Sequence, residues 1–250
     1  KGENDTFKVS QMWMKGYSDK LFTPQLHGRE HIQWWKWMND LQLGGEEALS
    51  SFKYKMCGVP KNVSKLSASY YEPVFVHDKF TSTEDNPLEE SIKESVNIFT
   101  DITGYSSISA IAPVLTWNEN IEKYWMSHGI KLIQGGRVQH INNHGQISYM
   151  ARFTGEFNSL GQVYTTRNCF FEPSKGDTVD KVMKQISIAF ILKKPAIISS
   201  HRINYVGGIR VANRDAGLKK LNELLSEIKK RWPDVVFMST KDFYKQLLDQ

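Results

Sequence analysis

Short apolar runs alternate with longer amphipathic stretches over the second half of this 250-residue chain, and this alternation limits the folds open to it. Apolar residues spaced at three and four positions predict helices, whereas the short apolar runs between them predict buried strands. The strands are expected over residues 109–115, 130–134, 163–171, 195–200 and 235–238, and the helices over residues 118–127, 178–192, 215–231 and from 241. Such alternation is typical of a parallel sheet or barrel, so the sequence predicts one α/β domain over residues 1–250.

The first part of the chain is expected to be mainly helical. Three helices are predicted, from near residue 27 to 43, over residues 46–57 and over residues 87–103. Gly44 and Gly104 supply the stops of the first and third helices. On the helix over residues 215–231, the side chains expected to face the core are Leu218, Leu221, Leu225 and Ile228.

The charge distribution argues against a nucleic-acid-binding protein, and the two distant cysteines argue against a disulfide-rich one. The formal charge is +5 at pH 7, and the densest basic residues fall near the C-terminal end of the helix expected over residues 215–231. That position complements the helix dipole and lacks interleaved aromatic residues, so a solvated helix face is expected, with no nucleic-acid partner. Cys57 and Cys169 lie far apart in sequence and are expected to be buried thiols. No apolar run is long enough to span a bilayer.

Polar and reactive residues follow the predicted strands at four places. These segments are residues 23–27, 112–117, 167–172 and 199–202. In parallel α/β folds the carboxyl ends of the strands form the mouth where ligands bind. The four segments are therefore expected to converge on one rim.

Two histidines in the first segment have metal-ligand spacing. His27 and His31 lie four residues apart, which places both imidazoles on one face of a first helical turn, where they suit one divalent metal ion. The alternative is that His31 is a core histidine beside the neighbouring tryptophans. A rival pair, His140 and His144, lies in a stretch that is expected to form a turn.

The segment that contains His201 has the features of an acid-base site. His201 directly follows an apolar strand, where an imidazole can titrate near neutral pH; the alternative is a structural histidine. Arg167, Asn168 and Glu172, at a neighbouring strand end, are candidates to orient His201 or to bind substrate. Arg167 and Glu172 could equally form a structural ion pair. Arg202 is assigned to substrate binding.

Trp117 ends another predicted strand at the same rim. Its ring offers the kind of apolar face on which a sugar stacks, whereas the alternative is ordinary packing in the core. Trp117 is therefore a candidate contact for a carbohydrate.

Several of these segments together resemble polysaccharide deacetylases of the NodB-homology type, in particular the divergent subgroup found with bacterial surface-polysaccharide gene clusters. The segments are residues 21–31 (LFTPQLHGREH), 111–113 (IAP), 133–137 (IQGGR), 167–174 (RNCFFEPS), 195–202 (PAIISSHR) and 232–239 (WPDVVFMS). The resemblance covers nearly the whole chain. It implies a distorted (β/α)7-type barrel of the glycoside hydrolase/deacetylase superfamily and a carbohydrate substrate.

The resemblance also implies roles for three histidines. His27 and His31 match the two metal-ligating histidines of the family, whose metal is usually zinc, and His201 matches the general acid. The implied reaction is hydrolysis of an N-acetyl group by a metal-activated water, which leaves acetate and an amino sugar. A bacterial cytoplasmic location is favoured, because no secretory signal is evident at Lys1.

The chain departs from the family in its first motif. It has no Asp-Asp pair, one member of which acts as base while the other binds metal, and only about two dozen residues precede His27. A missing N-terminal segment with the first strand is expected, or else a natural variant without the base. Without those aspartates the chain alone is expected to bind metal poorly and turn over little. The arginine and glycine usual around the proline that Pro113 matches are also not evident.

Two other functions fit parts of the sequence. Residues 27–31 also match H-x-x-E-H, the inverted zinc-peptidase motif, in which Glu30 would activate the water if the motif lay in mid-helix. A non-catalytic carbohydrate-binding domain of the same fold would explain the absent aspartates.

Overall fold

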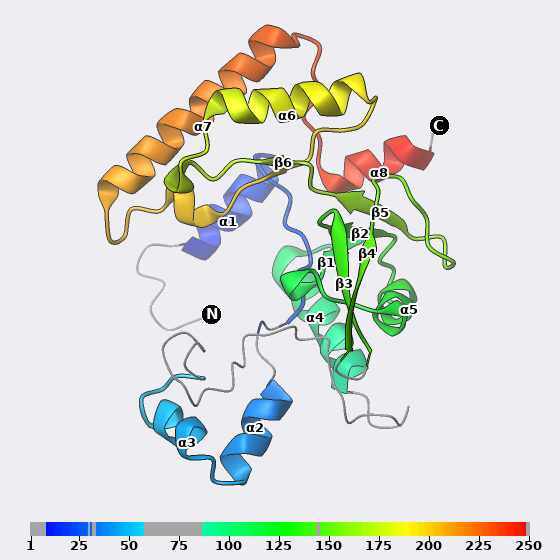
Figure 1. Ribbon diagram of the computed structural model, residues 1–250, viewed down its shortest axis with the longest axis vertical. Coiled ribbons are helices and arrows are strands. Elements are labelled where there is room, and N and C mark those ends of the chain that lie inside the picture. Colours follow the sequence, from blue (N-terminus) through cyan, green and yellow to red (C-terminus); the bar gives the residue numbers. More distant parts are fainter. Residues whose placement is uncertain (1–8, 30, 32–33, 58–86, 144–145, 249–250) are drawn as a thin grey trace. The chain divides into compact units, whose positions relative to one another are not determined.

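The computed structural model describes residues 9–29, 31, 34–57, 87–143 and 146–248 (Figure 1). The chain forms two compact units. The first unit comprises Lys1–Ile133, Val138–Ala151 and Phe157–Gln162, and the second comprises Gln134–Arg137, Arg152–Glu156 and Val163–Gln250. The described part of the chain is mixed α/β, with helices and small sheets, as the sequence predicts.

Helices are the longest elements among the described residues of the first unit. They are α1 (Val9–Ser18), α2 (Trp34–Gln42), α3 (Glu46–Lys53), α4 (Pro87–Thr103) and α5 (Glu119–Ser127). The predictions for α4 and α5 are confirmed. They succeeded because a clear local signal marks a boundary of each helix. Gly104 adopts a φ of 75° directly after α4, and the Asn118 side chain accepts hydrogen bonds from the first-turn amides of α5.

Two helices of the first unit are shorter than predicted. α2 begins at Trp34 instead of near His27, because Gly28 has a φ of 89° and interrupts a helical turn there. α3 ends at Lys53 instead of residue 57, because Lys55 has a φ of 58°. His27 therefore precedes α2 and does not lie on its first turn.

The first unit also contains short strands. β1 (Ser109–Ile111) stops well before residue 115, because Pro113 begins a 3-10 turn, η2 (Pro113–Leu115), in which Val114 has a φ of 54°. β2 (Leu132–Gly135) confirms the next predicted strand. Its residues 132 and 133 belong to the first unit, and its residues 134 and 135 belong to the second.

An antiparallel hairpin follows that the sequence did not predict. β3 (Val138–Asn143) pairs with β4 (Gln146–Ala151), in a register that runs from Val138 opposite Ala151 to Asn143 opposite Gln146. Asn142 and Asn143, where a turn was expected, belong to β3, and residues 144 and 145 of the same expected turn lie outside the described part of the chain.

The second unit alternates strands and helices. Its elements are β5 (Val163–Thr166), β6 (Cys169–Phe170), η3 (Pro173–Lys175), α6 (Val179–Ile191), β7 (Ile198–Ser199), η4 (Arg202–Tyr205), α7 (Val211–Arg231) and α8 (Thr240–Leu248). β6 and β7 are parallel, with Cys169 opposite Ile198 and Phe170 opposite Ser199.

One predicted strand of this unit is divided and another is absent. The strand expected over residues 163–171 changes partners: the Arg167 amide donates to the Gly135 carbonyl, whereas the Cys169 amide donates to the Ile197 carbonyl. The strand expected over residues 235–238 does not form, and the Val235 amide instead closes a turn on the Trp232 carbonyl.

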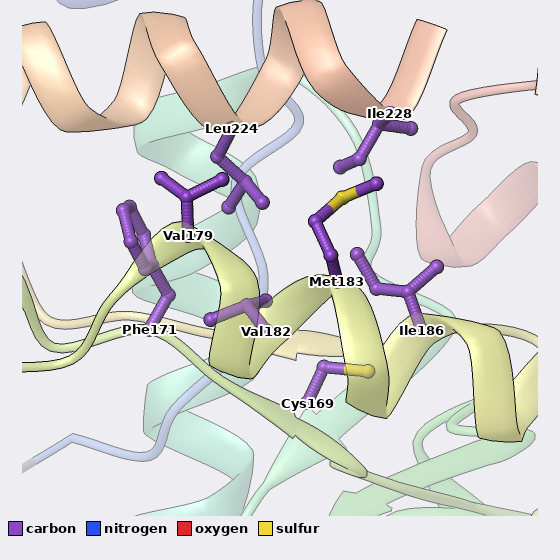
Figure 2. Packing of buried hydrophobic residues seen from close by; sticks show 8 residues of the cluster. All are labelled: Cys169, Phe171, Val179, Val182, Met183, Ile186, Leu224 and Ile228. Atoms are coloured by element: carbon purple, nitrogen blue, oxygen red, sulfur yellow. The ribbon is translucent and has the colours of Figure 1, made fainter. Parts of the chain in front are cut away.

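The core of the second unit lies between α6 and α7. Figure 2 shows two side chains of α7 pointing toward the apolar face of α6. The buried members are Cys169, Phe171, Val179, Val182, Met183, Ile186, Leu224 and Ile228. Burial confirms Cys169 as a buried thiol and raises its pKa to about 11, whereas Cys57, also expected to be buried, is half-buried.

The buried face of α7 differs from the predicted one. Leu218 and Leu225 are 46% and 40% exposed, whereas Leu224 is 1% exposed and Gly217 is buried. The face runs through residues 217, 221, 224 and 228, which keeps helical spacing. Apolar periodicity missed it because one of its positions is a glycine.

A closed barrel is not present among the described residues. Their strands form a three-stranded sheet and two two-stranded sheets. No described helix is long and apolar enough to cross a membrane.

The core predicts a contrast between two neighbouring phenylalanines. Phe171→Ala should lower the free energy of unfolding by about 3–5 kcal/mol, because it empties a fully buried site. Phe170→Ala, at a position that is 39% exposed, should cost less than about 1 kcal/mol. Chemical denaturation of both variants measures the difference, and equal losses would contradict this description of the core.

Candidate functional site

A histidine and a glutamate meet where the parallel pair β6 and β7 ends. The register places Phe170 opposite Ser199, so Glu172 and His201, two residues further on, leave the sheet side by side. His201 Nδ1 lies 2.6 Å from Glu172 Oε1. This part of the predicted convergence of strand ends is confirmed.

The glutamate in this pair is a carboxylate that hydrogen bonds hold in place. Its side chain is 13% exposed, against 66% for His201. Burial acts to raise the pKa of Glu172, but hydrogen bonds from Asn204 and His201 outweigh it and leave that pKa below its usual 4.5. A carboxylate only accepts hydrogen bonds, so His201 Nδ1 is the donor. Nε2 is then the ring atom that can exchange a proton.

Asn204 fixes the glutamate from the opposite side. This side chain is fully buried, and its Nδ2 donates to Glu172 Oε2 at 2.6 Å and to the His201 carbonyl at 2.8 Å. Its Oδ1 accepts from the amide and the hydroxyl of Ser174, at 3.0 and 2.6 Å. All four hydrogen bonds of the amide are therefore made, which specifies one orientation for Asn204.

Helix α7 packs directly against the backbone of this asparagine. A Cβ placed on Gly217 would lie 1.9 Å from the Asn204 carbonyl oxygen, closer than any two such atoms approach. Only glycine allows the helix backbone to come this near to η4. Gly217 therefore ties the core of the second unit to the His201 segment.

Further hydrogen bonds hold the two segments around the pair. The Glu172 amide donates to Asp177 Oδ2 at 2.8 Å, and Lys181 forms an ion pair with the same carboxylate. The Ser200 hydroxyl donates to the Phe171 carbonyl at 2.6 Å and lies 2.7 Å from the Tyr205 hydroxyl. Ser200, just before His201, and Tyr205, shortly after it, are therefore both held by hydrogen bonds.

The other predicted residues of this unit lie nearby with different contacts. Asn168 donates to the Pro195 carbonyl at 2.8 Å and accepts from the Ile197 amide at 2.7 Å, so it joins two backbone segments. Arg167 is half-buried, with Nη1 3.4 Å from Ser199 Oγ. Within the described residues no ion pair joins Arg167 to Glu172. Arg202 is exposed directly after His201.

His27 and His31 lie in the first unit and come together there. Their ring centroids are 4.6 Å apart, with the ring planes at 40°. Leu26, just before His27, forms a parallel bridge with Ala110 of β1. Both histidines are exposed, so His31 is not the core histidine of the alternative interpretation. The described residues contain no group of three or more His, Cys, Asp or Glu that could hold a metal ion.

The rival histidines and Trp117 have other environments. His140 packs edge-on against Tyr149 at 5.2 Å, and His144 lies outside the described residues. Trp117 is 1% exposed, and its Nε1 donates to Glu122 Oε1 at 2.9 Å. A ring buried in this way has no free face for a sugar, so the structure favours the packing alternative for Trp117.

Two residues of the His201 network had no function assigned from the sequence, Asn204 and Gly217. Both lack the titratable groups that indicate catalysis, and Gly217 lies inside a helix where glycine usually destabilises. That unfavourable position is the one local signal that the helix is approached closely by another backbone.

The hydrogen bonds of Glu172 predict a pH-dependent stability. Because its pKa is lowered on folding, the carboxylate stabilises the protein above about pH 4.5 and loses this effect as the pH falls through the folded-state pKa. Glu172→Gln should therefore lower the free energy of unfolding by about 1–3 kcal/mol near neutral pH and by less in acid. Denaturation across this pH range tests it, with the exposed Glu223→Gln as control. A difference that grows toward low pH would contradict the assignment.

Comparison with known proteins leaves the family open. A scan against protein-family models found no match, and a search of curated proteins found none either. The arrangement of the side chains is therefore what supports a function.

Proposed function

We propose that this protein is a metal-dependent deacetylase that hydrolyses N-acetyl groups on a carbohydrate, with the distorted (β/α)7-type barrel of that superfamily. The observation that carries the proposal is the His201–Glu172 pair at the carboxyl ends of two parallel strands, fixed by the buried Asn204. An exposed imidazole oriented by a buried carboxylate is a suitable proton donor.

His201 would deliver the proton that the leaving group needs. Water adds to the acetamide carbonyl carbon and gives one proton to a carboxylate base, the role that the resemblance assigns to an aspartate of the family's first motif, and a tetrahedral intermediate results. The C–N bond then breaks as Nε2 of the imidazolium donates its proton to the departing nitrogen. The products are acetate and a free amino sugar. Glu172 acts as a positioning residue: it holds the ring through Nδ1 and stabilises the imidazolium by its charge.

His27 and His31 would hold the metal. Their adjacent, exposed rings suit two neighbouring ligand positions, and a catalytic zinc site takes three protein ligands in total, so the pair supplies part of it. When bound, such an ion polarises the carbonyl and lowers the pKa of the attacking water.

Arg202 is the strongest candidate for a substrate contact. It follows His201 directly, and within the described part of the chain it forms no ion pair. Arg167 and Asn168 stay candidates at the neighbouring strand end, although the bonds of Asn168 to two backbone segments support a structural role.

A non-catalytic carbohydrate-binding domain is the second candidate function. The observation that favours it is that no three-ligand group occurs among the described residues. The zinc-peptidase interpretation loses its support, because it requires the 27–31 motif in mid-helix, and the nearest described helix begins at Trp34. Glu30 itself lies outside the described residues.

Catalysis by His201 predicts a graded loss of acetate release. In the full protein as its gene encodes it, His201→Ala should lower kcat by about 10²–10⁴-fold, the usual contribution of a general acid. Glu172→Gln should lower kcat while leaving KM nearly unchanged, since it disturbs only the orientation and charge of the ring. Acetate release from N-acetylated oligosaccharides measures both, with His140→Ala as the matched histidine control.

Two outcomes of this experiment would decide against the proposal. Full activity of the His201→Ala variant would show that His201 is not the general acid. Absence of acetate release by the unmodified protein, together with measurable oligosaccharide binding, would establish the non-catalytic binding domain instead.

Metal binding predicts a separate result for the first unit. His27→Ala and His31→Ala should each weaken zinc binding by more than about tenfold, because losing a ligand should cost at least as much as losing an outer-shell partner. Titration calorimetry with zinc alone measures the affinity. Unchanged binding in both variants, or an equal loss in His140→Ala, would show that the metal is held elsewhere.

A further inference from the structure

Residues 202–214, which comprise η4, the residues that connect it to α7 and the first turn of α7, expose aliphatic side chains among arginines. Figure 1 shows the connecting residues turning outward before the first turn of α7. The exposed aliphatic residues of this segment are Ile203 (57%), Val206 (44%), Ile209 (99%) and Val211 (55%), and its arginines are Arg202, Arg210 and Arg214. We call residues 202–214 the arginine loop.

Hydrogen bonds and close packing fix the shape of the arginine loop. Asn213 Nδ2 donates to the carbonyls of Ile203 and Val206, at 2.8 and 3.0 Å. A Cβ on Gly207 would meet Arg214 Cβ at 3.2 Å, whereas one on Gly208 would meet nothing within 4 Å. The base of the loop is therefore packed, and its tip, where Ile209 lies, faces open space.

The charge around this tip is positive. Arg202 and Arg210 form no ion pair within the described part of the chain, while Arg214 is paired with Asp215 at 2.9 Å. The N-terminus of α7, a helix of 21 residues, adds the positive end of its dipole at the same place, and no side chain caps it. An apolar tip beside the unpaired Arg210 and the positive end of the α7 dipole is complementary to a surface that is apolar below and anionic above.

We propose that the arginine loop docks this protein on an anionic phospholipid surface. Ile209 enters the boundary between headgroups and acyl chains, and the neighbouring Arg210 contacts the lipid phosphates. A nucleic-acid site would favour stacking aromatic side chains over an aliphatic tip. The inference does not depend on the deacetylase proposal, but it places the lipid surface beside the segment that carries His201.

Sedimentation with lipid vesicles tests the docking. The full protein should bind vesicles of phosphatidylcholine with phosphatidylglycerol more strongly than vesicles of phosphatidylcholine alone, and added salt should weaken the binding. Arg210→Ala should lower the partition coefficient about fivefold, which is the effect of about 1 kcal/mol per basic residue. Ile209→Asp should lower it at least about tenfold.

Matched substitutions elsewhere in the second unit control for general effects. Lys229→Ala removes one charge at the other end of α7, and Ile191→Asp changes an isoleucine that is 78% exposed on α6. Both should bind like the unmodified protein. Absence of binding to anionic vesicles would overturn the proposal, and so would Ile209→Asp binding as strongly as Ile191→Asp. All four positions are exposed, so thermal unfolding should stay unchanged.

Discussion

The buried side chain of Asn204 is the interaction on which the His201 site depends. This side chain bonds to residues 30 and 32 positions earlier in the chain, and the backbone carbonyl of Asn204 lies directly against α7 at Gly217. A buried amide that loses a partner is costly, so the four bonds are kept or lost together. The orientation of His201 is in this way a consequence of how the whole second unit packs.

Parallel pairing positions the reactive residues in each of the two units. In the first unit a parallel bridge at Leu26 precedes His27, and in the second unit β6 and β7 deliver Glu172 and His201 to the same end. The rule that polar residues gather at the carboxyl ends of parallel strands therefore holds within each of the two units. Within the second unit, the exposed loop that follows His201 brings aliphatic and cationic side chains near that end.

The sequence identified the residues with their own chemistry and missed those that act through packing. His201 and Glu172 were found because ionisable groups after apolar strands are a strong signal. Asn204 and Gly217 carry no such signal, and their importance lies in one hydrogen-bond network and one backbone contact. Trp117 was assigned to the rim because its position at a strand end does not reveal that its ring is buried.

Local signals determined the helices, because the information that sets them lies within a few residues. Asn118 and Thr178 cap α5 and α6, and Gly104 stops α4, each through contacts that the neighbouring sequence already specifies. Only the tertiary structure decided which strands pair, where the run over residues 163–171 changes partner, and which face of α7 is buried. A strand is defined by a partner distant in the chain, and no property of its own residues names that partner.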